Sequence, residues 1–399
     1  MVGLGIPLLA SVALYGCLAG KTSKETGAAG SEAGASGEET SVAGSQTGAS
    51  VQTTVTVAPT EGNVRLIGRT FEEDGATWLP QSGSAIEFVA TGARVELEMV
   101  GDQSAENKPD LCPRYAVLVD GTVVVDETLT ERTRVVEVPA GGPLAGAVIE
   151  VILLSEALQG AVGIRSIVVE TSESTPVAPS AAKAMSIGFV GDSITCGYGV
   201  EGTASDEIFK TTTENFMKSY AYLTARELDA DYDTVCYSGF GIVSGWSADG
   251  ERNGQMLVPP LYDLVVGGRG QKWDFAAHPR DVVVINLGTN DDSYTGTNEA
   301  RREEFSQGYA EFLSSVRELN PNSLIICTMG TMGGEELYAY IEKAARSHIE
   351  RTGDTRVICY LSDPIDMQRD GCGTGEHPNE ITQRKSAQKL VDVIRQALA

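Results

Sequence analysis

The sequence is short of positive charge. Its 399 residues include 30 Lys and Arg against 55 Asp and Glu, which gives a formal net charge of −25 at pH 7. A protein that binds nucleic acid needs a surplus of Lys and Arg, because its affinity depends on neutralising phosphates and releasing their counterions. The charge balance therefore excludes nucleic acid as a partner. It predicts a soluble surface with no strong attraction to anionic membranes.

Motifs for cofactors are also lacking. The turn after the first strand of the second domain reads GDSITC, not GxGxxG, and no GxxxxGK[ST] phosphate loop occurs, so nucleotide binding has little support. No spacing of Cys and His is typical of a metal site. We therefore expect neither a metal nor a cofactor. Internal repeats are absent as well.

The apolar run LGIPLLASVALYG, at residues 4–16, is too short to span a bilayer and has the length of a signal peptide. We expect residues 1–16 to be such a signal. Cys17 follows directly, and LYGC resembles a bacterial lipoprotein box. This resemblance implies that Cys17 is lipidated and that the folded part lies outside the cell, with the anchor as its only membrane contact.

Residues 19–62 contain no Leu, Ile or aromatic side chain. Such a segment cannot bury enough apolar surface to offset the entropy that is lost on ordering. We therefore expect residues 17–61 to form a flexible tether between the anchor and the folded part.

Six Cys remain beside Cys17, and they either pair as disulfides or stay as thiols. Cys236, Cys327 and Cys359 lie in apolar, strand-like runs, which favours buried thiols. Cys359 and Cys372 could close a short loop instead, and the sequence does not decide this.

Short β-branched segments such as SAIEFVAT, ARVELEMV and AVIEVILL fill residues 62–172, with Gly, Pro and Asp turns between them. Asp120 and Gly121 separate two such runs, as a two-residue hairpin turn requires. No helix-length pattern interrupts the series. We expect an all-β sandwich of the jelly-roll type, with no catalytic cluster of its own.

A linker containing Pro and Ser is expected at residues 173–183. Beyond it, at residues 184–399, apolar runs such as MSIGFV, DVVVINLG and SLIICTM alternate with amphipathic, helical stretches. This alternation predicts an α/β domain whose parallel sheet of about five strands is flanked by helices. In such folds ligands bind at the carboxyl ends of the strands.

Four sequence blocks fall at these strand ends or before the last helix. They are GDSITCGYG with Ser193, YSGFG with Gly239 and Gly241, GTND with Asn290, and GEHPN with His377. Ser193 alone would be read as a helix cap, and it does not lie in the GxSxG elbow of the α/β-hydrolases. The ordered set resembles the SGNH or GDSL hydrolase superfamily. With a β-sandwich in front, the chain is similar to carbohydrate esterase family 2, which implies removal of acetyl groups from polysaccharides.

Ester hydrolysis needs a nucleophile, a base and donors for the oxyanion. We expect Ser193 to attack the acetyl carbonyl, and His377 to take its proton and return it to the leaving sugar hydroxyl. The oxyanion donors would be the Ser193 N–H, the Asn290 side-chain amide and the N–H of either Gly239 or Gly241. The sequence does not choose between the two glycines.

The base is selected from only three His. His348 falls in the middle of a charged amphipathic helix and is predicted to face solvent, and His278 precedes a strand at its amino end, so His377 remains. Many SGNH enzymes have Asp three residues before this His, where Thr374 stands here. We therefore expect a Ser–His dyad whose imidazole is oriented by a backbone carbonyl.

The predicted function is that of a serine esterase which hydrolyses O-acetyl esters on polysaccharides of the acetyl xylan or glucomannan type. Two alternatives stay open: an esterase for O-acetyl groups on surface glycans or peptidoglycan, and a non-catalytic, glycan-binding surface lipoprotein. Tyr198, Trp246 and Tyr294 follow the first three strands and are candidates for stacking on sugar rings. Asp192 and Asp291 are interpreted as structural residues that bond nearby backbone N–H groups.

Overall fold

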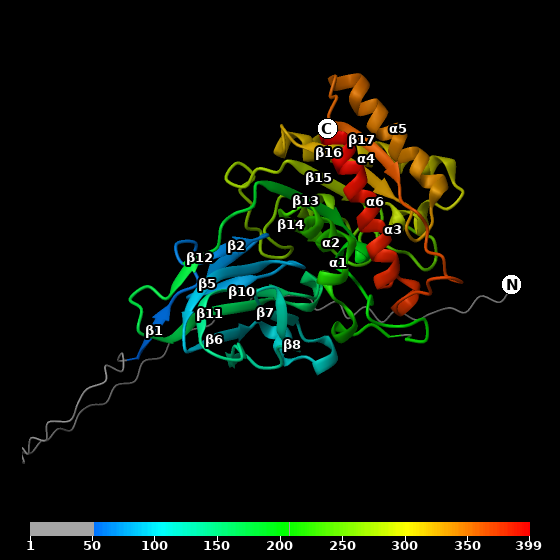
Figure 1. Cartoon of the computed structure of the whole chain (residues 1–399). Helices are drawn as coiled ribbons and strands as arrows, with labels where there is room; N and C mark the ends of the chain where they lie inside the picture. Colours follow the sequence, from blue (N-terminus) through cyan, green and yellow to red (C-terminus); the bar gives the residue numbers. More distant parts are fainter. Residues whose placement is uncertain (1–51, 207) are drawn as a thin grey trace, which may run out of the picture. The chain divides into compact units, whose positions relative to one another are not determined.

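The computed structural model describes residues 52–206 and 208–399. The predicted signal peptide, the lipidation site Cys17 and most of the predicted tether lie outside this range. None of the described helices combines the length and apolarity that a membrane crossing requires. The described residues belong to one compact unit, in which two antiparallel sheets precede a parallel one (Figure 1).

The first part is a β-sandwich, as predicted. One sheet has the strand order β3-β4-β11-β6-β9 with β1 also paired to β11, and the other has the order β12-β5-β10-β7-β8 with β2 also paired to β5. The strands are β1 (Thr53–Val57), β2 (Arg65–Ile67), β3 (Phe71–Glu73), β4 (Ala76–Leu79), β5 (Ala85–Gly92), β6 (Arg94–Gly101), β7 (Arg114–Val119), β8 (Thr122–Thr128), β9 (Thr133–Glu137), β10 (Leu144–Leu153), β11 (Val162–Thr171) and β12 (Val177–Pro179).

Apolar side chains from both sheets share one core, which includes Phe88, Leu97, Met99 and Tyr115. The predicted hairpin turn joins β7 to β8. Asp120 and Gly121 both have positive φ there, 48° and 78°, as a tight turn between antiparallel strands requires.

Two segments that we expected to lie outside the domains are strands. Thr53–Val57, within the predicted tether, pairs with residues 167–171 at the end of β11. The preceding residues 162–164 of the same strand pair with β4. The Thr53–Val57 sequence TTVTV is β-branched throughout, so an open strand edge is enough to order it. Val177–Pro179, within the predicted linker, pairs with β5. The tether and linker predictions are therefore wrong for these residues.

The second part contains a five-stranded parallel sheet in the order β14-β13-β15-β16-β17, in agreement with the prediction. Its strands are β13 (Met185–Gly191), β14 (Ala230–Cys236), β15 (Val282–Asn286), β16 (Leu324–Met329) and β17 (Val357–Leu361). The α-helices are α1 (Ser193–Cys196), α2 (Tyr220–Glu227), α3 (Thr289–Thr295), α4 (Glu299–Leu319), α5 (Glu335–Thr352) and α6 (Glu380–Leu398).

Helices cover both faces of this sheet. Val282 and Val284 of β15 share an apolar cluster with residues of α2 and α6. Val283 and Ile285, which alternate with them and point to the opposite face, belong to a cluster with residues of α4 and α5. The carboxyl ends of the strands are therefore left for the loops that carry the candidate site.

Short 3₁₀ helices lie in the connections of both parts. They are η1 (Gln103–Glu106), η2 (Pro109–Leu111), η3 (Ala157–Gln159), η4 (Thr211–Thr213), η5 (Phe216–Lys218), η6 (Pro259–Leu261) and η7 (Thr374–Glu376).

Buried polar contacts join the sandwich to the parallel sheet. Arg69, which follows β2, is 1% exposed and donates from Nε to Asp233 Oδ2 of β14 at 2.9 Å. Its Nη1 donates to the carbonyls of Tyr262 and Leu264. Burial would raise the pKa of Asp233, but the charges of Arg280 and Arg69 outweigh that effect and hold the pKa at about 2. The junction is thus an ordered, charged interface within the described chain.

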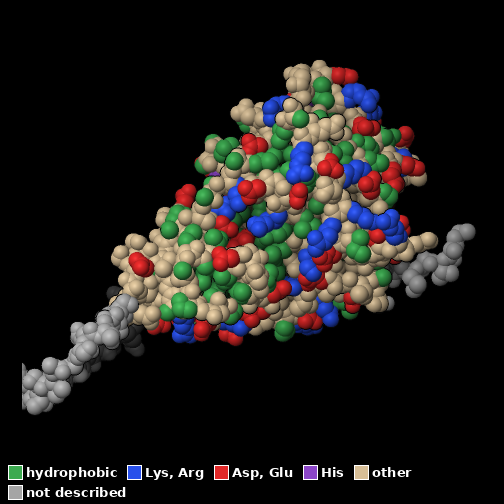
Figure 2. All heavy atoms as spheres, viewed as in Figure 1, with side chains coloured by type: hydrophobic (Ala, Val, Ile, Leu, Met, Phe, Trp, Pro, Cys, Tyr) green, Lys and Arg blue, Asp and Glu red, His purple; other side chains and the backbone are tan. Residues whose placement is uncertain are grey.

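All six Cys of the described residues are free thiols. Cys236 and Cys327 are buried, as expected, while Cys359 is half-buried. Cys359 and Cys372 do not form the short disulfide loop that the sequence left open. On the face drawn in Figure 2, acidic and basic side chains are interspersed, so the negative surplus does not form a single acidic patch there.

Candidate active site

Ser193 and His377 form the centre of the candidate site. β13 ends at Gly191, and Asp192 caps the one-turn helix α1 by accepting the Ile194 N–H at 3.0 Å, which makes Ser193 the first helical residue. His377 follows η7 and lies just before α6. Its Nε2 is 2.9 Å from Ser193 Oγ. The two blocks, 184 residues apart in sequence, thus meet at the carboxyl end of β13.

Backbone carbonyls orient the imidazole. His377 Nδ1 lies 3.1 Å from the carbonyl oxygens of both Thr374 and Gly375. Because both atoms are acceptors, the hydrogen-bond pattern assigns the proton to Nδ1 and leaves the Nε2 lone pair free to accept the Ser193 O–H. Within the described residues no carboxylate bonds to this ring. Burial lowers the pKa of His377 to about 4, against the opposing effect of the two carbonyl bonds.

The loop after β14 offers one backbone donor. From Tyr237 to Ser244 the other amides donate to described acceptors: Tyr237 to Gly191 O, Ser238 to Glu156, Phe240 to Tyr237 O, Gly241 to Met256 O, and Ile242, Val243 and Ser244 to Asp291. The Gly239 N–H has no such partner. Gly239 also has φ of +82°, a conformation that favours glycine. Of the two glycines that the sequence left open, Gly239 therefore has the available N–H.

Asn290, the second residue of α3, lies between this loop and the Ser193 turn. Its Nδ2 donates to Phe240 O at 2.8 Å and to Asp192 Oδ2 at the longer distance of 3.3 Å. The longer bond leaves one amide hydrogen weakly held beside the nucleophile turn. Asp192 and Asp291 both bond backbone N–H groups, as expected, but those that Asp291 bonds belong to the loop after β14.

Three comparisons with known proteins agree with this geometry. A model of the GDSL-like lipase/acylhydrolase family matches residues 189–385. The chain is 34% identical over 217 residues to the cellulase/esterase CelE of Acetivibrio thermocellus, a match that covers 53% of this chain and only 25% of that relative. It is 24% identical over 357 residues to an acetylxylan esterase/glucomannan deacetylase of Cellvibrio japonicus, which covers 87% of this chain and 92% of the relative.

Solved structures extend the likeness over both parts. A family two carbohydrate esterase from Clostridium thermocellum, in complex with cellohexaose, gives a TM-score of 0.73 at 27% identity and covers 84% of this chain and 99% of that chain. The chain is thus similar, over both of its parts, to a carbohydrate esterase of family two. An acetyl xylan esterase from Butyrivibrio proteoclasticus, at a TM-score of 0.77 and 21% identity, shares the fold.

The three aromatic candidates differ in exposure. Trp246 is 39% exposed, and its backbone N–H donates to Gly239 O at 2.7 Å, so this residue belongs to the loop that carries the free amide. Tyr198 packs against the His377 imidazole with ring centroids 4.3 Å apart. Tyr294 is buried, with Arg301 over its ring and Glu304 on its hydroxyl. The expectation that Tyr294 stacks on a sugar ring is therefore wrong, because its ring is already covered.

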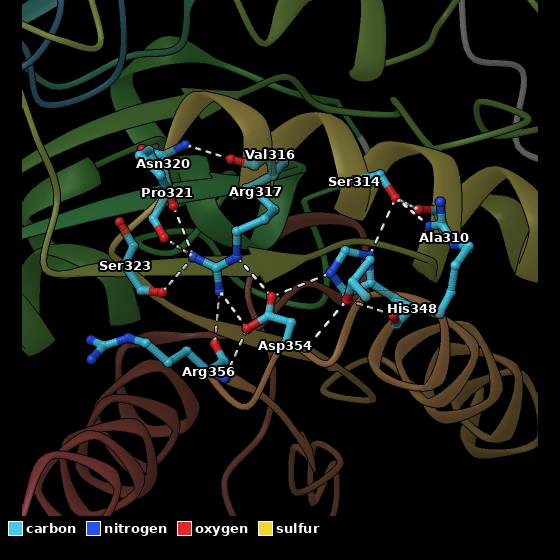
Figure 3. A network of polar contacts seen from close by, with 12 residues as sticks. Ala310, Ser314, Val316, Arg317, Asn320, Pro321, Ser323, His348, Asp354 and Arg356 are labelled. Atoms are coloured by element: carbon cyan, nitrogen blue, oxygen red, sulfur yellow. Dashed lines mark hydrogen bonds and ion pairs between the residues drawn. The ribbon is translucent and has the colours of Figure 1, made fainter.

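The other two His lie away from the site. His278 is exposed and stacks on Trp273 before β15. His348 is only 1% exposed, so the prediction that it faces solvent is wrong. Figure 3 shows its ring between Ser314 of α4 and Asp354, each at 3.2 Å.

Ser314, His348 and Asp354 are the residue types of a Ser–His–Asp triad, but their other hydrogen bonds differ from those of a catalytic triad. Ser314 Oγ donates to the Ala310 carbonyl at 2.8 Å and accepts from Arg351, so its proton is engaged within the helix. Asp354 also binds the Arg317 guanidinium, which donates to four backbone carbonyls as well. The network in Figure 3 ties α4 to α5 and to the following loop.

Sequence patterns did not indicate one residue near the site, Glu156 of the sandwich. Its carboxylate meets the loop after β14, although the sandwich sequence contains no catalytic pattern. Glu156, Cys196 and Glu214 place potential ligand atoms within 4.8 Å of one another, the one such group among the described residues. Glu156 Oε2 and Glu214 Oε2 already accept backbone N–H groups, so the cluster is held together by its own hydrogen bonds.

The pKa of His377 leads to a testable pH dependence. The base must be neutral to accept the Ser193 proton, so activity falls as the pH drops through its pKa. We expect the acid limb of kcat/KM for 4-nitrophenyl acetate to have its midpoint near pH 4, well below the ordinary histidine value of about 6.5. A midpoint at or above pH 6 would contradict the buried, neutral imidazole.

Proposed function

We propose that the protein is a serine esterase that hydrolyses O-acetyl esters on polysaccharides of the acetyl xylan or glucomannan type. The observation that carries the proposal is the 2.9 Å contact between Ser193 Oγ and His377 Nε2, beside the free Gly239 N–H. One relative is an acetylxylan esterase/glucomannan deacetylase and another is a cellulase/esterase, which supports the choice of substrate.

The geometry provides each element of acyl transfer. Ser193 Oγ attacks the acetyl carbonyl carbon while its proton passes to His377 Nε2. The tetrahedral oxyanion accepts hydrogen bonds from the Ser193 N–H, the Gly239 N–H and Asn290 Nδ2. When the intermediate collapses, the bond between the carbonyl carbon and the sugar oxygen breaks, and Nε2–H protonates that oxygen. A water molecule, deprotonated by His377, then releases acetate and restores Ser193.

Trp246 is proposed as the sugar platform. Its exposed ring lies on the same loop as the Gly239 amide, where a polysaccharide chain would pass as its acetyl group enters the site. Tyr198 has a different proposed role: it packs on His377 and limits the movement of the imidazole.

The function is tested by acetate release from acetylated xylan, acetylated glucomannan and O-acetylated peptidoglycan, with the full chain as enzyme. We expect release from xylan or glucomannan. Release from peptidoglycan alone would instead identify surface glycans as the substrate. Binding of polysaccharide without any acetate release would overturn the proposed esterase function and would favour a glycan-binding protein.

We also propose that Cys17 is lipidated and holds the enzyme at the outer surface of the cell envelope. The lipoprotein-like LYGC sequence supports this. A Cys17→Ser variant, expressed in a bacterial host, is expected to move from the detergent-extracted membrane fraction to the soluble fraction. Equal partition of variant and wild type would contradict the anchor.

A further inference from the structure

Glu156 brings a sandwich carboxylate into the parallel-sheet domain. It lies between β10 and η3, in the connection LLSEALQG, and is only 1% exposed. A buried carboxylate needs hydrogen bonds to offset its lost hydration. Its partners therefore show what this side chain holds in place.

One oxygen of Glu156 contacts both sides of the candidate site. Oε2 accepts the Ser238 N–H at 2.7 Å and lies 3.8 Å from Cys196 Sγ. Ser238 directly precedes Gly239, whose N–H is free. Cys196 ends α1, the single turn that starts at Ser193. The carboxylate thus lies between the turn that carries the nucleophile and the loop that carries the backbone donor.

Glu156 is itself fixed by Glu214, a residue between η4 and η5 in the second part of the chain. The Glu156 N–H donates to Glu214 Oε2 at 3.0 Å, and the Glu214 carbonyl accepts from Arg114 Nη1 of β7 at 3.0 Å. Burial raises the pKa of both glutamates.

We propose that Glu156 is a positioning residue for ester hydrolysis, which aims the Gly239 N–H at the oxyanion by holding the Ser238 amide. This inference rests on the proposed esterase function. The Ser238 N–H is the last amide before Gly239 and donates to Glu156, while the carbonyl of the same peptide, Tyr237 O, accepts from the Phe240 N–H.

Three variants of the full chain test the proposal, with 4-nitrophenyl acetate as substrate. Glu156→Met and Glu156→Leu keep much of the volume but lose the acceptor, and Glu156→Gln keeps an acceptor oxygen. Glu150→Gln is the matched control, because Glu150 is also a buried sandwich glutamate, on β10, and has no contact with the site. Each protein is compared with wild type by kcat, KM and the midpoint of thermal unfolding.

We expect kcat to fall about 10- to 100-fold in the apolar variants with KM within about threefold, because a misaimed donor weakens binding of the transition state and leaves substrate binding intact. Glu156→Gln and Glu150→Gln should keep at least about a third of wild-type kcat. Three outcomes would each overturn the proposal. The apolar variants could fold and keep wild-type kcat, Glu156→Gln could lose as much kcat as they do, or both apolar variants could fail to fold. An inactive wild type would instead refute the proposed function.

Discussion

Replacement of Ser193 by alanine is expected to lower kcat for acetate release by roughly 10⁴- to 10⁶-fold. The hydroxyl is the atom that forms the acyl-enzyme, and no other described hydroxyl bonds to His377 Nε2. What remains in the variant is the stabilisation by the oxyanion donors, which still favours slow attack by water. The measurement is kcat on 4-nitrophenyl acetate and on acetylated xylan.

Ser315→Ala is a matched control for this loss. Ser315 is exposed on α4, where its hydroxyl donates to the Glu311 carbonyl, and the variant should retain wild-type activity. Ser193→Ala should still bind acetylated polysaccharide, because the loops that carry Trp246 and Gly239 are unchanged. Hydrolysis by Ser193→Ala at the wild-type rate would show that the reaction takes place elsewhere.

His377→Ala is expected to cause a loss of similar size, about 10⁴-fold or more in kcat, since Ser193 would have no base within hydrogen-bonding distance. The acyl-enzyme should then fail to accumulate in a rapid-mixing experiment with 4-nitrophenyl acetate. His278→Ala should have wild-type kinetics, because His278 is exposed before β15. A small effect of His377→Ala would contradict its assignment as the base.

Thr374→Val separates a dyad from a side-chain triad. The carbonyl of Thr374 orients the imidazole, whereas its buried Oγ1 has no hydrogen-bond partner. Valine keeps the carbonyl and the shape of the side chain, so the variant should retain at least about a third of wild-type kcat. A loss larger than tenfold would mean that the hydroxyl has a part in orienting His377.

Sequence patterns predicted the parts of the molecule that depend on local periodicity. Four of the five parallel strands are mostly apolar runs, and the Asp120–Gly121 turn has the residues that positive φ demands. Parallel strands bring their carboxyl ends to one edge, so the blocks with Ser193 and His377 were expected to meet.

The features that the sequence did not reveal depend on tertiary contacts. Thr53–Val57 is ordered by the free edge of β11, and His348 is buried because Ser314 and Asp354 satisfy its polar ring. Tyr294 is covered by a guanidinium from α4. Glu156 meets Ser238 across 82 residues of sequence. No pattern within one segment carries this information, because each partner belongs to a different element.

The contact of Asp291 with Ile242, Val243 and Ser244 has a consequence for the electrostatics of the loop. Three consecutive amides that converge on one carboxylate form an anion nest, and here the chain supplies the anion itself. The dipoles of these three amides stabilise the negative charge of Asp291, and the first of the amides, that of Ile242, lies only three residues after Gly239. The Asp291 site is always filled by the protein, whereas the oxyanion site that we propose at the Gly239 N–H of the same loop would be filled only while the substrate carbonyl carries negative charge.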